Sequence, residues 1–391
     1  MSHIKNKRWD VFCKIVDNYG DIGVCWRLSQ QLAHEHHLQV RLFVDDMAAA
    51  TKIITTLDCT KNKQVISGVV VCHWPTLENC SEIKPAKVVL ETFSCGLPDC
   101  YIPQMVLRNC MWINLEYLSA ESWVSDFHAK PSPHPSLAIT KHYFFPGFKS
   151  DTGGLIRESN LTDERIGFIK TKEKQTEYWQ KIDIPKANEL GDDAIKISLF
   201  CYPQADITSL VSALETANQP ISLFIPFNSS ITAMIDSMCE ANEKSSKEIH
   251  KGNLTIHLLP FLSQADYDHL LWACDLNFVR GEDSWIRAIW AEKPFIWQPY
   301  IQTDDTHIKK LNAFLDLYLS AANAEVKSVV YEAQLAWSEV YTSTPAPFSR
   351  LIKHLAELKV YAIQQTNKLA LQSDLATRLV IFSENLTENK V

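Results

Sequence analysis

The sequence predicts an α/β protein made of two doubly wound, Rossmann-like domains that face a central cleft. The chain has 391 residues, a length that suits two domains. Short strand-like runs alternate with helical patterns, which is typical of βαβ units around a parallel sheet. The alternation stops near the middle of the chain and then starts again. We therefore expect one sheet in each half.

The first half begins with strand-like runs rich in β-branched and aromatic residues. Strands are expected at residues 9–16, 38–44, 67–73, 87–91 and 111–115. A helix is expected over 24–36, because its apolar residues recur at helical intervals. From 126 to 154 the chain is rich in Pro, Gly, Ser and His, so we expect a long irregular segment there.

The second half repeats the alternation after a polar break. A polar helix at about 170–181 is followed by DIPKANELGDDA, which is typical of a linker. Strands are then expected in IKISLFCY, ISLFIPF, LTIHLLPF, LNFVR and PFIWQPY, and the tail from 347 to 382 is expected to be helical throughout. We place the domains at 1–182 and 195–391 with a linker over 183–194, and we allow the C-terminal helix to pack back on the first domain.

The bulk composition excludes several classes of protein. Apolar residues make up 46% and charged residues 21% of the chain, as in ordinary globular proteins. The net charge of −8 argues against broad nucleic-acid binding. Eleven cysteines contain no CxxC pair, the start MSHIKNKRWD has no apolar signal core, and no run is long enough to span a membrane. We expect a cytoplasmic protein.

One turn near the N-terminus, DNYGDIGVCWRL, joins the first predicted strand to the first helix. Ligands of open α/β sheets bind at such turns. Asp17 and Asp21 are therefore candidates to deprotonate or orient a nucleophile, with Asn18, Tyr19 and Gly20 between them. Ordinary turn chemistry is the alternative, because Asp often starts turns and caps helices. Both interpretations stay open on position alone.

A second turn of this kind contains Arg280, Gly281, Glu282, Asp283 and Ser284. Glycine lets a backbone approach a ligand closely. Ser284 is expected to cap the next helix, and a helix N-terminus is a good site for an anion. Arg280 could add a bidentate contact to phosphate. Alternatively, the acidic residues only favour the helix dipole and Arg280 pairs with one of them.

The stretch LPFLSQADYDHLLWACDLNFV places a third turn one βα unit earlier. Ser263 and Asp266 have the spacing of a helix cap. Phe261 could stack on a nucleobase and Gln264 could bind its edge. The alternative for Phe261 is a hydrophobic staple at the helix start. An aromatic turn beside an anion-binding turn is the layout of a nucleoside-diphosphate site.

Other possible sites have less support. His128, His134 and His142 match no zinc spacing, so we expect no metal. No GxGxxG or GxxxxGK[ST] motif occurs. Two doubly wound domains around a cleft also occur in GT-B glycosyltransferases, sugar-nucleotide epimerases and periplasmic-type binding proteins. Paired carboxylates together with an anion-binding turn favour an enzyme over a binding protein among these classes.

The two long motifs, DNYGDIGVCWRL and LPFLSQADYDHLLWACDLNFVRGEDSWIRAIWAEKPFIWQPY, together resemble the elongation factor P arginine rhamnosyltransferases, the EarP family. The resemblance implies a GT-B fold. It also implies inverting transfer of rhamnose from dTDP-β-L-rhamnose to one arginine in the N-terminal domain of translation elongation factor P, which relieves ribosome stalling at proline runs. It implies no metal, no other cofactor, no nucleic acid and no membrane, and we expect a monomer.

The resemblance also implies roles for single residues. Asp21 resembles the general base, with Asp17 supporting the acceptor guanidinium and Glu282 needed for activity. The donor is expected to contact Tyr202, Phe261, Gln264, Arg280, Gly281, Asp283, Ser284 and Tyr300. Glu116 and Tyr117 lie on another turn of the acceptor side. A GT-B enzyme with another acceptor, an epimerase and a sugar-nucleotide binding protein remain the alternatives.

Overall fold

The computed structural model describes residues 8–17, 19–78, 80–184, 194–227, 229–237, 247–338 and 344–388. Its contacts divide the chain into two units. The first contains Met1–Ser159 and Leu371–Val391, and the second contains Asn160–Ala370. Each unit is built on its own mostly parallel sheet, so the predicted α/β class with two doubly wound domains is confirmed.

The boundary between the units differs from the one placed at 182. Helices α5 (Leu161–Lys170) and α6 (Lys172–Lys181) belong to the second unit. There, Phe168 packs against His269 and Trp272. A polar helix shows little of its partner in its own sequence, which is why these two helices were placed in the first domain. Most of the linker expected at 183–194 lies outside the described residues.

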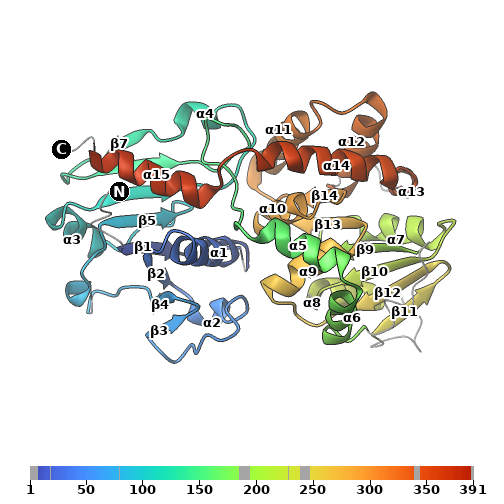
Figure 1. Ribbon diagram of the computed structural model, residues 1–391, viewed down its shortest axis with the longest axis horizontal. Helices are drawn as coiled ribbons and strands as arrows, with labels where there is room; N and C mark the ends of the chain where they lie inside the picture. Colours follow the sequence, from blue (N-terminus) through green and yellow to red (C-terminus); the bar gives the residue numbers. More distant parts are fainter. Residues whose placement is uncertain are drawn as a thin grey trace. The chain divides into compact units, whose positions relative to one another are not determined.

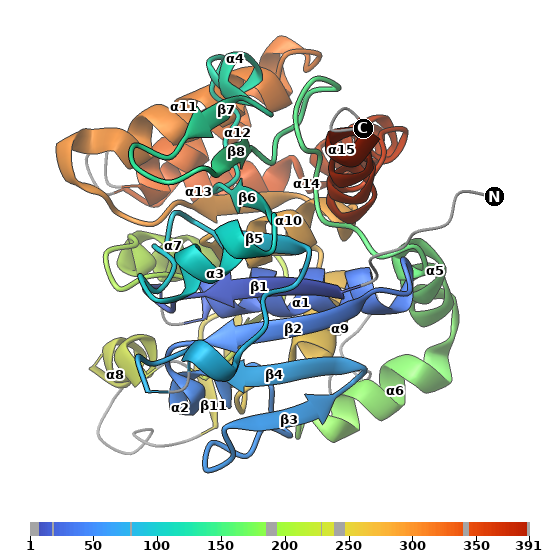
Figure 2. The same ribbon diagram turned by 90° about the vertical axis from the view of Figure 1, so that its left-hand side faces the viewer.

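The first unit contains an eight-stranded sheet in the order β3-β4-β2-β1-β5-β6-β8-β7. Figure 2 shows this order from β3 at the bottom to β7 at the top. The strands are β1 (Arg8–Cys13), β2 (Gln39–Val44), β3 (Lys63–Ile66), β4 (Val69–His73), β5 (Val88–Thr92), β6 (Met111–Leu115), β7 (Pro131–Pro133) and β8 (Thr140–Phe144). Pairing is parallel except at the two edges, where β3 and β7 run antiparallel to their neighbours.

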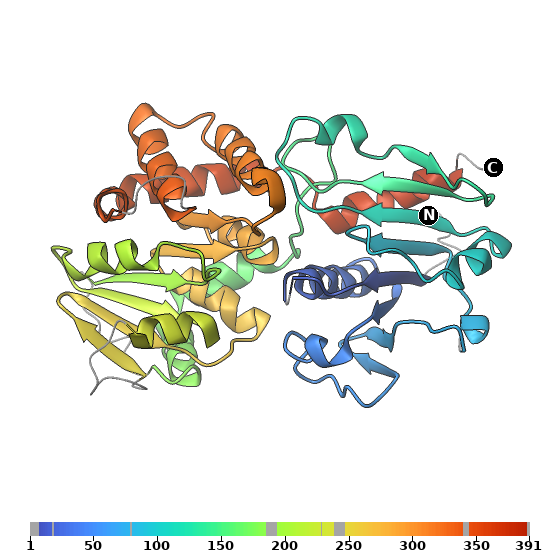
Figure 3. The same ribbon diagram turned by 180° about the vertical axis from the view of Figure 1, so that it is seen from behind.

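Helices join and cover these strands. They are α1 (Gly20–His34), α2 (Met47–Ala50), α3 (Tyr101–Leu107), α4 (Val124–Phe127) and the C-terminal α15 (Leu375–Glu388), with a short 3-10 helix η1 (Cys80–Glu82). Figures 1 and 3 show α1 and α15 on the same face of the sheet. The two helices are tied together, because Gln31 Nε2 donates to Asp374 Oδ1 at 3.1 Å. The C-terminal helix is thus part of the first unit.

The segment expected to be irregular, 126–154, is partly ordered, and that expectation was wrong. It contains β7 and β8, and β8 extends the sheet by pairing with β6. Pro131 and Pro133 concealed the edge strand, since proline is tolerated at an edge but weakens a strand pattern. The tail is also not one helix: it breaks at His354 and again before Leu375.

The core of the first unit is aromatic. Phe12 stacks on Phe43 with ring centroids 4.6 Å apart, and Tyr101 packs edge-on against Phe12. Asp10 is fully buried between these groups and accepts two hydrogen bonds from Arg41, each 2.6 Å long. A buried carboxylate needs such a partner. Cys80 and Cys100 form a disulfide, which the sequence pattern did not indicate.

The second unit contains a six-stranded sheet in the order β11-β12-β10-β9-β13-β14, with only β11 antiparallel. The strands are β9 (Ile195–Leu199), β10 (Ile221–Ile225), β11 (Glu248–Lys251), β12 (Leu254–Leu258), β13 (Leu276–Arg280) and β14 (Phe295–Gln298). All five strands predicted in this half are present, and β11 was missed because it is short and polar at its ends.

Helices cover both faces of this second sheet. They are α7 (Ile207–Glu215), α8 (Ser229–Ser237), α9 (Gln264–Ala273), α10 (Asp283–Trp290), α11 (Thr306–Tyr318), α12 (Ala324–Trp337), α13 (Ala346–Lys353) and α14 (Leu355–Ala370), with a 3-10 turn η3 (Thr303–Asp305). Figure 1 shows α9 on one face, and the rear view in Figure 3 shows α7 on the other. None of the helices in the described ranges has the length and hydropathy needed to cross a bilayer.

Candidate active site

Each sheet reverses its winding at one place, and the sequence candidates lie there. The neighbours of β1 are β2 and β5, and the neighbours of β9 are β10 and β13. Ligands of doubly wound sheets bind outside the carboxyl ends of the strands at such switch points. The loops after β1 and β5 therefore form the candidate site of the first unit, and the loops after β9 and β13 that of the second.

Asp21 lies in the first turn of α1 and is 2% exposed. Its Oδ2 accepts hydrogen bonds from the backbone N–H groups of Val16 (2.8 Å) and Asp17 (2.9 Å). Its Oδ1 accepts one from the Tyr117 hydroxyl at 3.0 Å. A carboxylate has about four acceptor positions, so these bonds fix the group and leave Oδ1 able to accept one more.

Tyr117, in the loop after β6, is therefore joined to the first turn by its bond to Asp21. Its ring stacks on Phe93, with centroids 4.3 Å apart and an interplanar angle of 12°. Phe93 and Ser94 follow β5 with positive φ angles of 57° and 51°. Glu116 accepts hydrogen bonds from Ser94 Oγ (2.7 Å) and Asn114 Nδ2 (2.5 Å), which ties the β5 and β6 loops together.

Phe93, in the turn after β5, is a residue of the candidate site that the sequence analysis missed. Its signal was the run TFSCG after a buried strand, in which a phenylalanine precedes polar turn residues. Two consecutive non-glycine residues with positive φ are uncommon and concentrate at functional sites. The strain here places an aromatic face against the tyrosine that holds Asp21.

Asp17 is half-buried beside Asp21, and the turn between them is tight. The Gly20 N–H donates to the Asp17 carbonyl at 2.7 Å, and Tyr19 is the N-cap of α1. A Cβ at Gly20 would lie 2.7 Å from Asp17 Oδ2. A side chain at this position would therefore displace the Asp17 carboxylate. Asn18 lies outside the described residues.

Two thiols and a threonine form the floor under this turn. Cys25 Sγ contacts Thr92 Oγ1 at 3.3 Å, and Thr92 donates to the carbonyl of Phe12 at 2.7 Å. A hydrogen bond with Cys25 and burial raise the pKa of Cys13 well above its ordinary value. The Cys13 thiol, with its raised pKa, therefore stays uncharged at neutral pH. Carboxylates above such a floor interact more strongly with a cation than they would in water.

In the second unit, Arg280 ends β13. Its guanidinium donates to the Cys201 carbonyl at 3.0 Å and lies over the rings of Phe200 (4.2 Å) and Tyr202 (4.6 Å). These contacts orient the guanidinium without neutralising its charge. Gly281 follows with a φ of +62°, a conformation that favours glycine.

The helix after this turn starts earlier than predicted. The N-cap of α10 is Glu282, without a side-chain capping bond, and Asp283 is the first helical residue. The expectation that Ser284 is the cap was wrong. Its hydroxyl instead bonds back to the Arg280 carbonyl and accepts from the Arg280 N–H at 3.1 Å, so it closes the turn.

The turn after β12 has the helix cap that the sequence predicted. Ser263 caps α9, as predicted, by accepting from the Asp266 N–H at 3.2 Å. Phe261 is 38% exposed, which leaves part of its ring open to a ligand. Gln264 Nε2 donates to Asp283 Oδ2 at 3.1 Å. The turn after β12, which contains Phe261, and the turn after β13, which contains Arg280, therefore lie side by side.

Tyr202 and Tyr300 join the same region. The Tyr202 N–H donates to Gln298 Oε1 at 2.7 Å, and its ring contacts the Tyr300 ring edge-on at 5.7 Å. Tyr300 is 49% exposed. The structure thus brings together Arg280, Tyr202 and Tyr300, which are far apart in sequence.

The three histidines considered as metal ligands have other partners. His128 Nδ1 accepts from the Phe145 N–H at 3.1 Å, and burial lowers the pKa of His128 to about 4. His134 Nδ1 accepts from the Leu137 N–H at 3.1 Å. The His142 ring packs against Phe382.

Comparison with known proteins gives one family. Residues 9–384 match the family described as elongation factor P (EF-P) rhamnosyltransferase EarP. The protein-arginine rhamnosyltransferase of Pseudomonas putida is 40% identical over 379 residues, which are 96% of this chain and 98% of that protein. The protein of the same name from Pseudomonas aeruginosa is 38% identical, covering 96% of this chain and 98% of that one.

Solved structures agree. One that describes EarP-mediated arginine glycosylation of translation elongation factor EF-P is 31% identical, with a TM-score of 0.66 over 97% of this chain and 99% of that chain. A UGT transferase from Siraitia grosvenorii in complex with UDP is only 9% identical, with a TM-score of 0.54 over 97% of this chain and 99% of that chain. The second likeness concerns the fold alone, and that fold is GT-B, as predicted.

Proposed function

The chain belongs to the EarP family and is a protein-arginine rhamnosyltransferase, and we propose that it transfers rhamnose from dTDP-β-L-rhamnose to one arginine of translation elongation factor P. The observation that carries this proposal is the different set of charged groups at the two switch points: the first has Asp17 and Asp21, and the second has Arg280 followed by Glu282 and Asp283. Asp17 and Asp21 suit a cationic acceptor, whereas Arg280 and the start of α10 suit an anionic donor.

The acceptor determines what the first unit must do. A guanidinium is protonated at any ordinary pH, and its delocalised nitrogen lone pairs make it a poor nucleophile. We propose that Asp17 pairs with the guanidinium and orients it. Asp21, held by three hydrogen bonds, would accept the proton of the attacking nitrogen.

The donor determines what the second unit must do. Phe261 is proposed to stack on thymine and Gln264 to bind its edge. Arg280, Ser284 and Tyr300 are proposed to hold the diphosphate, and Glu282 to support the reaction. In the transfer step, the bond between rhamnose C1 and the phosphate oxygen breaks, a C1–N bond forms with inversion, and dTDP leaves. The cation at Arg280 would stabilise that leaving group.

The test is to incubate the purified chain with elongation factor P and dTDP-β-L-rhamnose and to measure the intact mass of the factor. A gain of one deoxyhexose on a single arginine is expected, together with release of dTDP. No gain with the donor consumed would indicate another acceptor, and an isomerised sugar would indicate an epimerase. Tight donor binding without consumption would indicate a binding protein. A translation factor as acceptor would place the reaction in the cytoplasm.

A further inference from the structure

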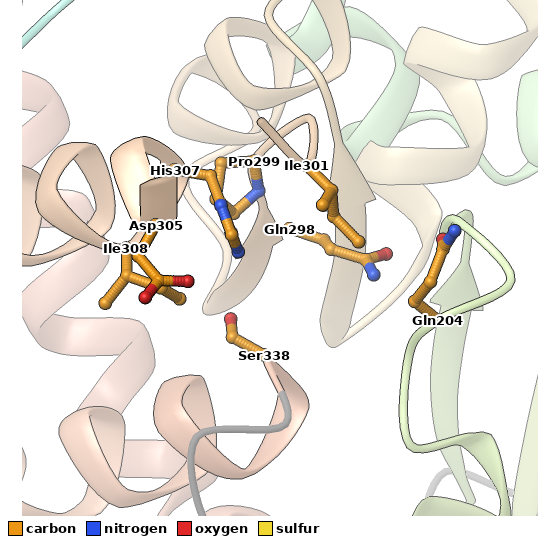
Figure 4. A pocket seen from close by; sticks show the side chains of 8 residues that line it. All are labelled: Gln204, Gln298, Pro299, Ile301, Asp305, His307, Ile308 and Ser338. Carbon is orange, nitrogen blue, oxygen red and sulfur yellow. The ribbon is translucent and has the colours of Figure 1, made fainter. Parts of the chain in front are cut away.

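The second unit contains a pocket of about 460 Å³ at the carboxyl ends of β9 and β14. Its polar lining comes from Gln204, Gln298, Asp305, His307 and Ser338. Figure 4 shows the Asp305 carboxylate, the His307 ring and the Ser338 hydroxyl directed toward one space, with the Gln298 amide between them and Gln204. None of these five residues was a sequence candidate.

The pocket adjoins the residues proposed to hold the donor diphosphate. Gln298 accepts the hydrogen bond from the Tyr202 N–H, and Tyr202 lies under the Arg280 guanidinium. The neighbours of Tyr300 in the chain, Pro299 and Ile301, both line the pocket. A group attached to a phosphate at Arg280 would therefore lie next to this pocket.

The size and chemistry of the pocket fit a sugar ring. Small-molecule sites have volumes of about 300–1,000 Å³, so this pocket is at the small end of that range. A carboxylate accepts hydrogen bonds from adjacent hydroxyls, and amides and imidazole can both donate and accept. The same carboxylate repels a phosphate, which argues against a second anion site. Ile301 and Ile308 add an apolar wall for a hydrocarbon edge such as a methyl group.

The backbone holds Asp305 at this pocket in an unusual conformation. Asp304 and Asp305 both have positive φ angles, 58° and 53°, directly before α11 begins at Thr306. Such a conformation costs an L-residue about 1 kcal/mol or more. The surrounding fold must compensate for it, and the result is a carboxylate aimed at the pocket instead of a regular helix start.

We propose that this pocket binds the hexose of the nucleotide-sugar donor, with Asp305 and His307 contacting its hydroxyls. The proposal rests on the proposed function, because it assumes that the donor diphosphate lies at Arg280. It adds a specificity role: the polar wall selects the hydroxyl pattern, and the isoleucines favour a sugar without a hydroxyl on carbon 6.

Calorimetric titration of dTDP and of dTDP-β-L-rhamnose tests this assignment with Asp305→Asn. Asparagine adopts positive φ as readily as aspartate, so the substitution keeps the turn. The affinity for dTDP should stay within about twofold, whereas the affinity for dTDP-rhamnose should fall at least about tenfold, as expected for hydrogen bonds to a charged group. Asp316→Asn is the matched control, because Asp316 is an exposed aspartate of α11, the helix that follows Asp305, and it should change neither affinity.

A second variant, His307→Gln, should show the same selective loss and covers the case in which Asp305→Asn does not fold. An equal loss of both ligands, or no loss of either, would overturn the proposal. Binding is measured without elongation factor P, so the outcome is independent of transfer. Failure of the proposed function would instead appear as no mass gain on the factor while the wild-type chain still binds dTDP-rhamnose.

Discussion

The β1–α1 turn of the first unit and the β13–α10 turn of the second occupy the same topological place, yet they differ in their charged groups, because only the second contains an arginine. In the first, a carboxylate at the start of the helix accepts the turn's own backbone N–H groups. In the second, a serine hydroxyl closes the turn, and an arginine stands at its entrance. One fold thus gives two turns with different charged groups and different internal hydrogen bonds.

The difference concerns the charged groups that stand at the start of each helix. An N-terminus with unoccupied amides attracts phosphate. Asp21 places a carboxylate in the first turn of α1 and no arginine or lysine lies in that turn, so an added phosphate would meet a negative charge there. A cationic ligand is the better partner for that turn. The comparison therefore predicts that lesions in the two turns have separable effects, on the acceptor in one and on the donor in the other.

The largest expected effect is that of Asp21→Asn. The amide keeps the size of the side chain and can still accept from the Val16 and Asp17 N–H groups, but it cannot take up a proton. Transfer should fall by about 1,000-fold, within the range for general bases. The affinity for dTDP-rhamnose should stay unchanged in calorimetry, because the donor is proposed to bind to the other unit.

Asp45→Asn is the matched control for Asp21→Asn. Asp45 Oδ1 also accepts a backbone hydrogen bond from the same loop, from the Ile15 N–H at 2.9 Å, but Asp45 has no proposed part in proton transfer. It should keep normal turnover. Normal turnover by Asp21→Asn, or an equal loss in both variants, would show that Asp21 only supports the loop.

The second effect is expected in the other turn, with Arg280→Gln. Loss of the guanidinium should weaken dTDP binding by about tenfold or more, since it would remove the proposed charge-assisted contact to phosphate. Arg350→Gln removes a cation of the same unit that pairs with Glu325 and Glu332 instead, and it should leave dTDP binding unchanged. If Arg280→Gln lowered transfer without changing nucleotide affinity, the charge contrast between the two turns would fail as an explanation.

The two turns also differ in how much of them the sequence could predict. The strands around both were found because their apolar runs are short and bounded by turn residues. The cap of α9 at Ser263 was correct, whereas the cap of α10 was misplaced by two residues. Ser284 has the composition of a cap, but its hydroxyl bonds to the preceding strand end. A hydrogen bond that depends on tertiary structure in this way cannot be recognised from the local sequence.

The contacts between loops could not be predicted for the same reason. Tyr117 was placed on the acceptor side, but its bond to Asp21 joins residues 96 positions apart. Phe93 lies in the turn after β5, and Asp305 and His307 lie at the start of α11, where the local sequence does not indicate a site. Strand β7 was hidden by its two prolines. Sequence patterns report each segment's own preferences, and the sheet order decides which loops meet.

The smallest expected effects are those of replacing the glycine in each turn, Gly281 in the second and Gly20 in the first, because the two glycines serve different purposes. Gly281 has a φ of +62°, so Gly281→Ala should destabilise the second unit by about 1 kcal/mol and lower the thermal unfolding midpoint. Gly20 needs space instead, because a Cβ there would lie 2.7 Å from Asp17 Oδ2. Gly20→Ala should therefore displace the Asp17 carboxylate and reduce turnover, with dTDP affinity unchanged. Weaker dTDP binding by Gly20→Ala would contradict the separation of the two turns. An unchanged unfolding midpoint together with unchanged dTDP binding in Gly281→Ala would show that the positive φ angle does not require glycine there.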